Sequence, residues 1–146
     1  MGKILSVNIS EKKGFKKHNV TSSRALIDLG LEHDAHIGME LRQISLLAAE
    51  SIEKIRQKGL NISYGDFAEN LTTEGIDLYT LPLGTKMKVG KDVLLEVTQI
   101  GKTCVKPCAI FYAVGDCVMP KEGIFARVLS PGNIKIGDDI TICHDI

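Results

Sequence analysis

The residues best suited to chemistry are the cysteines, three of which lie close together. Cys104, Cys108 and Cys117 fall within fourteen residues, and Cys143 lies near the C-terminus. Their C-x3-C-x8-C spacing differs from the C-x2-C pair of a zinc ribbon. The plain interpretation is a set of buried, inert thiols, because free cysteine is among the most buried residue types. We expect Cys143, at the end of an expected strand, to be structural.

Thiolate chemistry is the alternative for the first two cysteines. Lys102 and Lys106 flank Cys104, and Lys106 also lies two residues before Cys108. A nearby cation favours the thiolate, which is the form that attacks electrophiles and carries sulfur. Thiolates also bind soft, thiophilic metals. Cys104 and Cys108 are therefore the candidate catalytic and metal-binding residues.

A polar cluster is expected in the loop after the second strand. It contains Asp34, His36 and Arg42. His36 is a candidate proton donor, and a His33-x2-His36 pair would also suit zinc, although this spacing is common by chance. Asn70, which ends the run Gly-Asp-Phe-Ala-Glu-Asn, is a candidate either for ligand contact or for capping a turn.

Two basic features could hold an anion. Arg127 lies inside an apolar strand, where it either faces outward or points into the fold and binds a phosphate with its guanidinium fork. Residues 11–24 carry the basic side chains Lys12, Lys13, Lys16, Lys17 and Arg24 against Glu11 alone. Such a run is either a solvated loop or a basic arm at the mouth of an anion site.

Length and composition narrow the class of protein. The 146 residues suit one domain, spanning 1–146, with a real hydrophobic core. The 18 basic and 18 acidic side chains cancel, which argues against a general nucleic-acid binder. No apolar run is long enough for a membrane span, and the N-terminus does not resemble a secretory signal, so we expect a cytoplasmic protein.

The elements that must position these residues are mostly short strands. A helix is expected at 47–58, ending at Gly59, with a shorter one at 65–71. The expected strands are 3–9, 24–29, 43–47, 85–89, 93–97, 124–129, 134–136 and 139–143. A long loop is expected at 10–22, and Pro131-Gly132 suits a type II turn.

The clearest hairpin spans 85–99. A three-residue turn at 90–92 would pair Met87 with Leu95 on the inner face and Lys86 with Glu96 on the outer face. Many short strands with antiparallel turns predict a mainly β fold, an antiparallel β-barrel with a few peripheral helices. The apolar connection 101–123 has no clean period and carries the clustered cysteines, as functional loops often do.

Six segments, taken in their order and spacing, are similar to one known family. They are Gly30–His36, Arg42–Leu47, Gly65–Thr72, Leu81–Thr85, Val97–Cys104 and Met119–Val128. Through them the chain resembles the MOSC domain, the C-terminal domain of molybdenum cofactor sulfurases, and most of all its short free-standing bacterial branch. The departures are His33 in place of the usual glycine before Asp34, and Leu41 in place of a polar residue.

The resemblance implies a β-barrel and a role around the molybdenum cofactor, a pterin with a dithiolene and a phosphate. It implies a cysteine that carries sulfur or binds molybdenum, matching Cys104 or, less directly, Cys108. The activities implied are sulfur transfer or molybdenum-dependent reduction of N-hydroxylated compounds. The implied partners are cofactor-biosynthesis proteins or a cysteine desulfurase. The candidate cofactor-binding residues are Arg127, Arg42, Asp34, Asn70, Lys16 and Lys17.

Three functional hypotheses stand at this point. The first is a cofactor-binding or sulfur-carrier protein that works through Cys104 or Cys108. The second is a non-catalytic accessory module that binds a molybdopterin-pathway partner and stores or delivers cofactor. The third is a small zinc-stapled β-domain.

Overall fold

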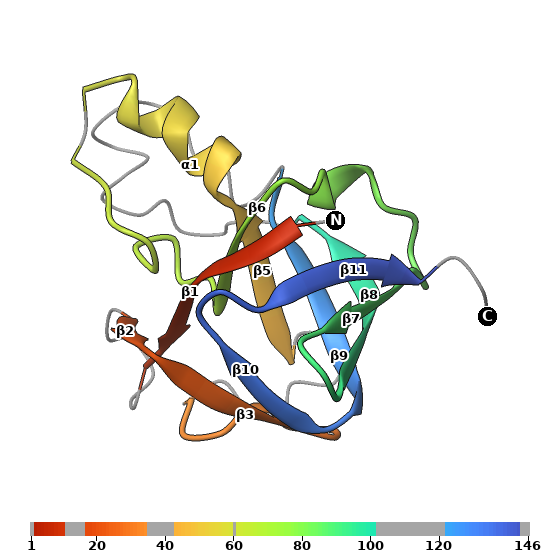
Figure 1. Cartoon of the computed structure of the whole chain (residues 1–146). Coiled ribbons are helices and arrows are strands. Elements are labelled where there is room, and N and C mark those ends of the chain that lie inside the picture. The colour runs from red at the N-terminus through yellow and green to blue at the C-terminus, as the bar shows by residue number, and fades with distance from the viewer. Residues whose placement is uncertain (1, 11–16, 35–42, 60, 102–121, 144–146) are drawn as a thin grey trace.

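A closed β-barrel organises the chain in the computed structural model (Figure 1), which describes residues 2–10, 17–34, 43–59, 61–101 and 122–143. Its seven strands run in the order β11-β7-β8-β9-β5-β6-β1, and pairing of β11 with β1 closes it. The elements are β1 (Gly2–Ile9), β2 (His18–Val20), β3 (Ser22–Leu26), β4 (Gly30–Leu31), β5 (Ile44–Ala48), α1 (Ala49–Arg56), β6 (Leu71–Glu74), the 3-10 helix η2 (Leu78–Thr80), β7 (Lys86–Val89), β8 (Val93–Ile100), β9 (Ile124–Ser130), β10 (Gly132–Lys135) and β11 (Asp139–Cys143).

The barrel is mixed, which corrects the purely antiparallel expectation. β5 and β6 pair in parallel, while the other barrel pairs are antiparallel. Parallel neighbours need a crossover connection, and the stretch containing α1 provides it. β2 extends the sheet beyond β1, and β10, β3 and β4 form a separate three-stranded sheet. No helix in the described part of the chain is long and apolar enough to cross a membrane.

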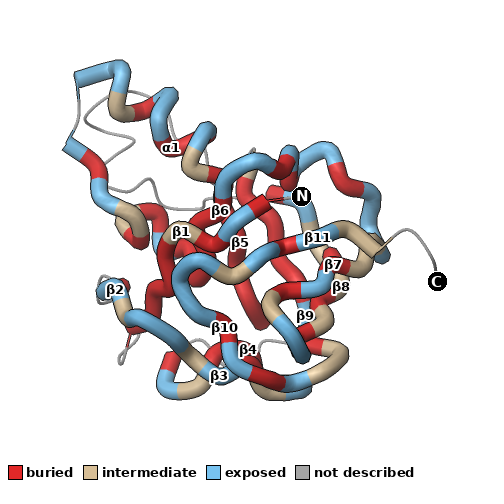
Figure 2. Tube along the Cα trace, in the orientation of Figure 1, coloured by how far each residue is buried: buried red, intermediate tan, exposed pale blue. Residues whose placement is uncertain are grey.

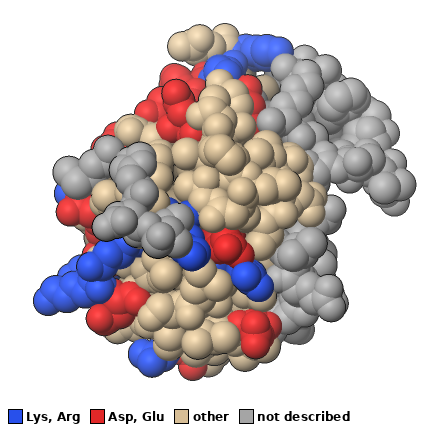
Figure 3. All heavy atoms as spheres, turned by 90° about the vertical axis from the view of Figure 1, so that its right-hand side faces the viewer, with Lys and Arg blue, Asp and Glu red and all other residues tan. Residues whose placement is uncertain are grey.

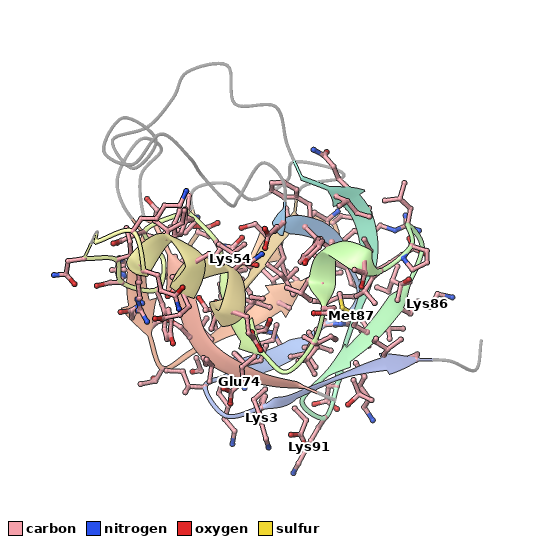
Figure 4. The ribbon with its side chains drawn as sticks, turned by 90° about the horizontal axis from the view of Figure 1, so that it is seen from above. Lys3, Lys54, Glu74, Lys86, Met87 and Lys91 are labelled. Carbon is pink, nitrogen blue, oxygen red and sulfur yellow. The ribbon has the colours of Figure 1, made fainter. Side chains whose placement is uncertain are left out.

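The barrel interior is the main hydrophobic core (Figure 2). Along β8, Val93, Leu95 and Val97 are buried while the residues between them are partly exposed. Met87 on β7 is fully buried opposite Leu95, and Figure 4 shows it among the side chains inside the barrel. The hairpin register predicted from the alternation is therefore confirmed, including the pairing of Lys86 with Glu96.

A second, smaller core lies on the outside of the barrel. Ile52 and Ile55 of α1 pack with Leu47 of β5, Phe67 and Phe125 of β9. The helical spacing of the two isoleucines thus attaches α1 to the outer wall, as expected, and α1 ends near Gly59, whose φ is +93°.

Several expected elements are different in the structure. Residues 64–67 form turns rather than a second helix, because Gly65 and Ala68 have positive φ and Leu71 enters β6. Strand β3 ends at Leu26, and the region expected to be a loop contains β2.

The prediction of a type II turn at Pro131-Gly132 is also wrong. Gly132 begins β10 and is absent from the described glycines with positive φ, which a type II turn requires at this position. Close packing explains the glycine instead, because a Cβ there would lie 2.8 Å from Cβ of Asp92.

The first prediction tests the inward face of β8. Leu95→Ala should lower the free energy of unfolding by about 2–5 kcal/mol, because it leaves a cavity in a fully packed core. Leu94 is the matched control, since it lies next in the strand but is partly exposed. Urea denaturation of both variants measures the difference, and equal losses would contradict the assigned faces.

Candidate functional site

Polar side chains are buried on the outer wall of the barrel where β1, β5 and β6 meet. A β-bulge between Ile4 and Ser6 creates part of this surface. Ile4, Val7 and Ile9 all pack into the interior core, so the bulge shifts the alternation and turns Ser6 and Asn8 outward. Ser6 Oγ donates a hydrogen bond of 2.6 Å to Oδ1 of Asn8.

Asn70 connects the strands at this point. Its Nδ2 donates to the carbonyl oxygen of Asn8 at 3.2 Å and to Oδ2 of Asp34 at 3.1 Å. Its Oδ1 accepts from the backbone N–H of Ser45 at 3.0 Å and from Oγ of Ser45 at 3.2 Å. The amide nitrogen and oxygen of Asn70 are thus both bonded within the protein. Asn70 therefore holds β1, β5 and Asp34 in position relative to one another.

Asp34 forms a buried ion pair with Lys17. Nζ of Lys17 lies 2.8 Å from Oδ1 of Asp34, and the two side chains are 3% and 1% exposed. The backbone N–H of Ser10 donates to the same carboxylate oxygen at 2.9 Å. Burial alone would raise the pKa of Asp34, but the bond and charge of Lys17, with the bonds from Ser10 and Asn70, lower it overall.

The ion pair changes the interpretation of the basic run. Lys17 is not part of a solvated arm, because its ammonium group is enclosed beside Asp34. Arg24 is exposed on β3, in the separate three-stranded sheet. The other members of the run, Lys12, Lys13 and Lys16, lie outside the described residues.

Glu69 is a buried carboxylate that sequence reasoning missed. It is fully buried, and it accepts hydrogen bonds from the N–H groups of Gly65 and Phe67 and from Oγ1 of Thr72, at 2.9, 3.2 and 2.7 Å. Burial raises the pKa of Glu69, although these hydrogen bonds oppose the rise. Its position beside Asn70 was the available signal, but position alone does not distinguish a buried acid from an exposed one.

The segment that carries the clustered cysteines leaves and rejoins the barrel next to this wall. Ile100 of β8 pairs with Ile124 of β9, and the N–H of Gly101 donates to the carbonyl of Gly123 at 2.6 Å. One step further along the ladder, Phe125 pairs with Gln99 on one side and with Ser45 on the other. Neighbouring strands lie about 4.8 Å apart, so three spacings, about 14 Å, separate this end of β8 from Asn70.

Arg127 faces outward, so the alternative in which it points into the barrel is wrong. Its Nε donates to Oε1 of Glu96 at 2.6 Å, and its side chain is 48% exposed. On the face in Figure 3, the basic and acidic side chains of the described residues are interspersed around an uncharged area. Whether Arg127 contacts a ligand stays a prediction.

The polar cluster expected around residue 34 is described only in part. His33 has a φ of +67° and a side chain 79% exposed, so it points to solvent while Asp34 points inward. His36 and Arg42 lie outside the described residues, as do Cys104, Cys108 and Cys117. Cys143 is a half-buried free thiol on β11, and no group of three metal-ligating side chains occurs among the residues described.

The second prediction concerns the ion pair and pH. Asp34→Asn leaves the buried ammonium group without its carboxylate and should cost about 3–5 kcal/mol near neutral pH. A lowered pKa means that the unfolded chain binds the proton more tightly, so the stabilisation is complete above the unfolded value of 3.8 and is lost as pH falls through the folded value. The gap between wild type and variant should therefore be constant from about pH 7 to about pH 5 and shrink as pH falls below 3.8.

Asp139→Asn is the control, because Asp139 is a half-exposed partner of Lys3. It should change the unfolding free energy little at any pH in that range, since exposed ion pairs contribute weakly. Chemical denaturation at a series of pH values measures all three proteins. A constant gap for Asp34→Asn would show that the carboxylate is not held in its charged form.

Known proteins show which family this fold and sequence belong to. The MOSC domain model matches residues 32–141, whereas no curated protein sequence matches the chain. YuaD from Bacillus subtilis superposes with a TM-score of 0.80 at 20% identity, covering 97% of this chain and 96% of that one. YiiM from Geobacillus stearothermophilus gives 0.73 at 21%, covering 99% and 76%, and YiiM from Escherichia coli gives 0.70 at 20%, covering 100% and 71%. These structures share the fold, and the family match shows that the chain belongs to the MOSC domain family.

Proposed function

We propose that this protein binds molybdenum cofactor or a precursor and works through a cysteine thiolate, Cys104 or Cys108, as sulfur carrier or metal ligand. Membership of the MOSC family supports a molybdenum-cofactor-related, sulfur-carrier kind of role. The observation that carries the finer proposal is the position of the segment's ends. They leave β8 and enter β9 beside a wall of buried polar groups that includes Asp34 and Asn70.

Chain length limits how far Cys104 can lie from the end of β8. Cys104 follows Gly101 by three residues, and three residues of extended chain reach about 11 Å at most. Cys108 has seven residues of chain, which reach about 25 Å. The covalent tether therefore keeps Cys104 close to the end of β8, whereas Cys108 has enough chain to span the three strand spacings to Asn70.

The residue types in the sequence support this proposal. When bound, the cofactor would supply a thiophilic molybdenum centre, for which a cysteine thiolate is the preferred protein ligand. Lys16, with Lys12 and Lys13, is proposed to attract its phosphate, and Lys17 holds the end of that run against the wall. His36 is proposed as a proton donor, with Arg42 as a further contact for the anion.

The accessory-module hypothesis differs in what the thiols do. In that case a cofactor-biosynthesis protein, or a cysteine desulfurase, would bind the barrel surface and the cysteines would be dispensable. Substitution of the thiols separates the two hypotheses, because it would abolish cofactor or sulfur binding in one and leave the partner complex intact in the other.

The third prediction concerns the thiols. At least one of Cys104 and Cys108 should react with iodoacetamide faster than Cys143, with a thiol pKa below the unperturbed value of about 8.5. Cys104→Ser and Cys108→Ser should both fold, because the change opens no large cavity, and one should lose bound cofactor or persulfide sulfur. Peptide mass spectrometry across a pH series measures the rates, and metal, pterin and sulfane-sulfur assays measure the content.

Cys143→Ser is the matched control and should keep both cofactor and sulfur. If both loop variants also keep them, or if both loop thiols are unreactive in the folded protein, the thiolate mechanism is wrong. The accessory-module hypothesis would then be preferred.

The fourth prediction concerns the basic run. Lys16→Gln should weaken binding of a phosphate-bearing pterin, more at low salt than at high salt, because salt screens exposed charges. Lys91→Gln, in the exposed turn after β7, should have no such effect. Titration at two ionic strengths tests this, and equal affinity of wild type and Lys16→Gln at low salt would assign the run to a solvated loop.

A further inference from the structure

We propose that an apolar surface at one end of the barrel is the contact between two copies of this chain, which associate as a weak two-fold dimer. The surface consists of Tyr79, Leu83 and Ile100, here called the apolar patch, which are 40%, 64% and 40% exposed. None of the three belongs to the buried polar wall, and the role of the patch is independent of the function proposed above.

The patch is part of a surface segment that is apolar on both of its sides. Leu78 and Leu81 are buried in the interior core, so the chain around η2 covers this end of the barrel, which Figure 4 shows from above. Tyr79 and Leu83 alternate with them and are exposed. The two buried leucines explain why the segment packs on the barrel, but they do not explain an exposed tyrosine and leucine. Large apolar side chains that are exposed together are typical of protein–protein contacts.

Backbone hydrogen bonds bring Ile100 to the same end of the barrel. The N–H of Gly84 donates to the carbonyl of Val97 at 2.8 Å, and the N–H of Val97 donates to the carbonyl of Thr85 at 2.9 Å. This stretch therefore runs antiparallel beside β8, with Leu83 next to the last residues of the strand. Ile100 ends β8, so the two exposed apolar side chains are neighbours.

Local contacts restrain the patch before any partner binds. The N–H and Oγ1 of Thr85 both donate to the carbonyl of Pro82, at 3.1 and 2.6 Å. The ammonium group of Lys54, on α1, lies 5.8 Å from the centre of the Tyr79 ring. A restrained surface loses less conformational entropy on association than a flexible one, which favours binding.

The charge distribution selects a second copy as the partner. A two-fold axis places the same surface of each copy against the other, so a charged side chain near the axis meets its own sign. Residues 78–85 and 97–101, which contain the patch, include no Lys, Arg, Asp or Glu. The patch can therefore face its own copy without like-charge repulsion. A charged partner would instead lose water here without gaining an opposite charge.

The other large apolar side chains that are exposed among the described residues lie beside charges. Ile27 and Leu29 flank the exposed Asp28, and Ile136 follows the exposed Lys135. A two-fold contact centred at either place would bring two like charges together. These positions are therefore less suited to self-association than the apolar patch.

The small size of the patch predicts a weak dimer. A stable protein–protein interface buries roughly 1,200–2,000 Å² in total. Three partly exposed side chains on each copy supply only the centre of such a contact. We therefore expect a dissociation constant in the micromolar range rather than the nanomolar range.

The fifth prediction tests the contact by sedimentation velocity on the full chain. Wild type should change from monomer to dimer as its concentration rises through the micromolar range. Leu83→Asp should raise the dissociation constant at least about tenfold, because two carboxylates would then approach each other in an apolar contact. Ile136→Asp is the matched control and should associate like wild type, since Ile136 is also an exposed apolar residue, at 47%, but lies outside the patch.

A mixture of two variants tests the two-fold arrangement itself. Leu83→Asp mixed with an equal amount of Leu83→Lys should associate more tightly than either variant alone, which neither misfolding nor a different partner would produce. Urea denaturation shows whether each variant is folded, and Leu83→Gln, which adds no charge, replaces Leu83→Asp if that variant folds poorly.

Three results would overturn the proposal. They are a wild type that stays monomeric at every concentration, an equal loss of association in Ile136→Asp, and a mixture of the two Leu83 variants that stays monomeric. The first result would assign the patch to an apolar surface of a different protein, and the second would place the contact elsewhere.

Discussion

The burial of the Asp34 carboxylate is the constraint on which the candidate site depends. An ionised carboxylate without partners is costly to remove from water, so the fold must bring donors to it. Those donors come from Ser10 at the end of β1, from Lys17 before β2, and from Asn70 at the start of β6. Because Asn70 also binds β5 through Ser45, one charge draws together groups from three parts of the sequence, at residues 10–17, 45 and 70. Hydrogen bonds thus fix the positions of the polar groups on the outer wall, whereas close packing of apolar side chains fixes the barrel interior.

Two buried carboxylates near Asn70 show how strongly the partners matter. Asp34 has a cation beside it, and its pKa is lowered. The described partners of Glu69 are neutral N–H and O–H groups, which do not outweigh its desolvation, and its pKa is raised. Buried ionic groups are weak evidence for stability, since apolar residues of equal volume often stabilise as much. Each of the two carboxylates accepts several hydrogen bonds, which fix polar geometry on the outer wall.

Local patterns in the sequence were sufficient for part of the fold. The hairpin of β7 and β8 could be predicted because alternation and a three-residue turn are local properties, and α1 because its isoleucines follow the helical period. The parallel pairing of β5 with β6 could not, since it depends on contacts across a crossover. The outward turn of Asn8 depends on a bulge that sequence alternation does not reveal. The sequence does not show that Lys17, unlike its neighbouring lysines, is buried, because only the folded chain brings Asp34 to it.

The position of the cysteine segment between two adjacent strands has an energetic consequence. A connection of 23 residues between β8 and β9 costs about 2 kcal/mol more chain entropy than a three-residue turn such as that between β7 and β8. Phe125, the second residue of β9, is buried in the outer core. Its burial stabilises the fold by about 1.5–3 kcal/mol and so offsets this entropy cost. The hydrogen bond that joins Gly101 to Gly123, and the bonds of Glu122 to Ser51 and Lys54, add to it. A long connection is therefore affordable at this place because its ends are joined to a pre-existing ladder and a fixed helix, which leaves the residues between them free to be selected for chemistry.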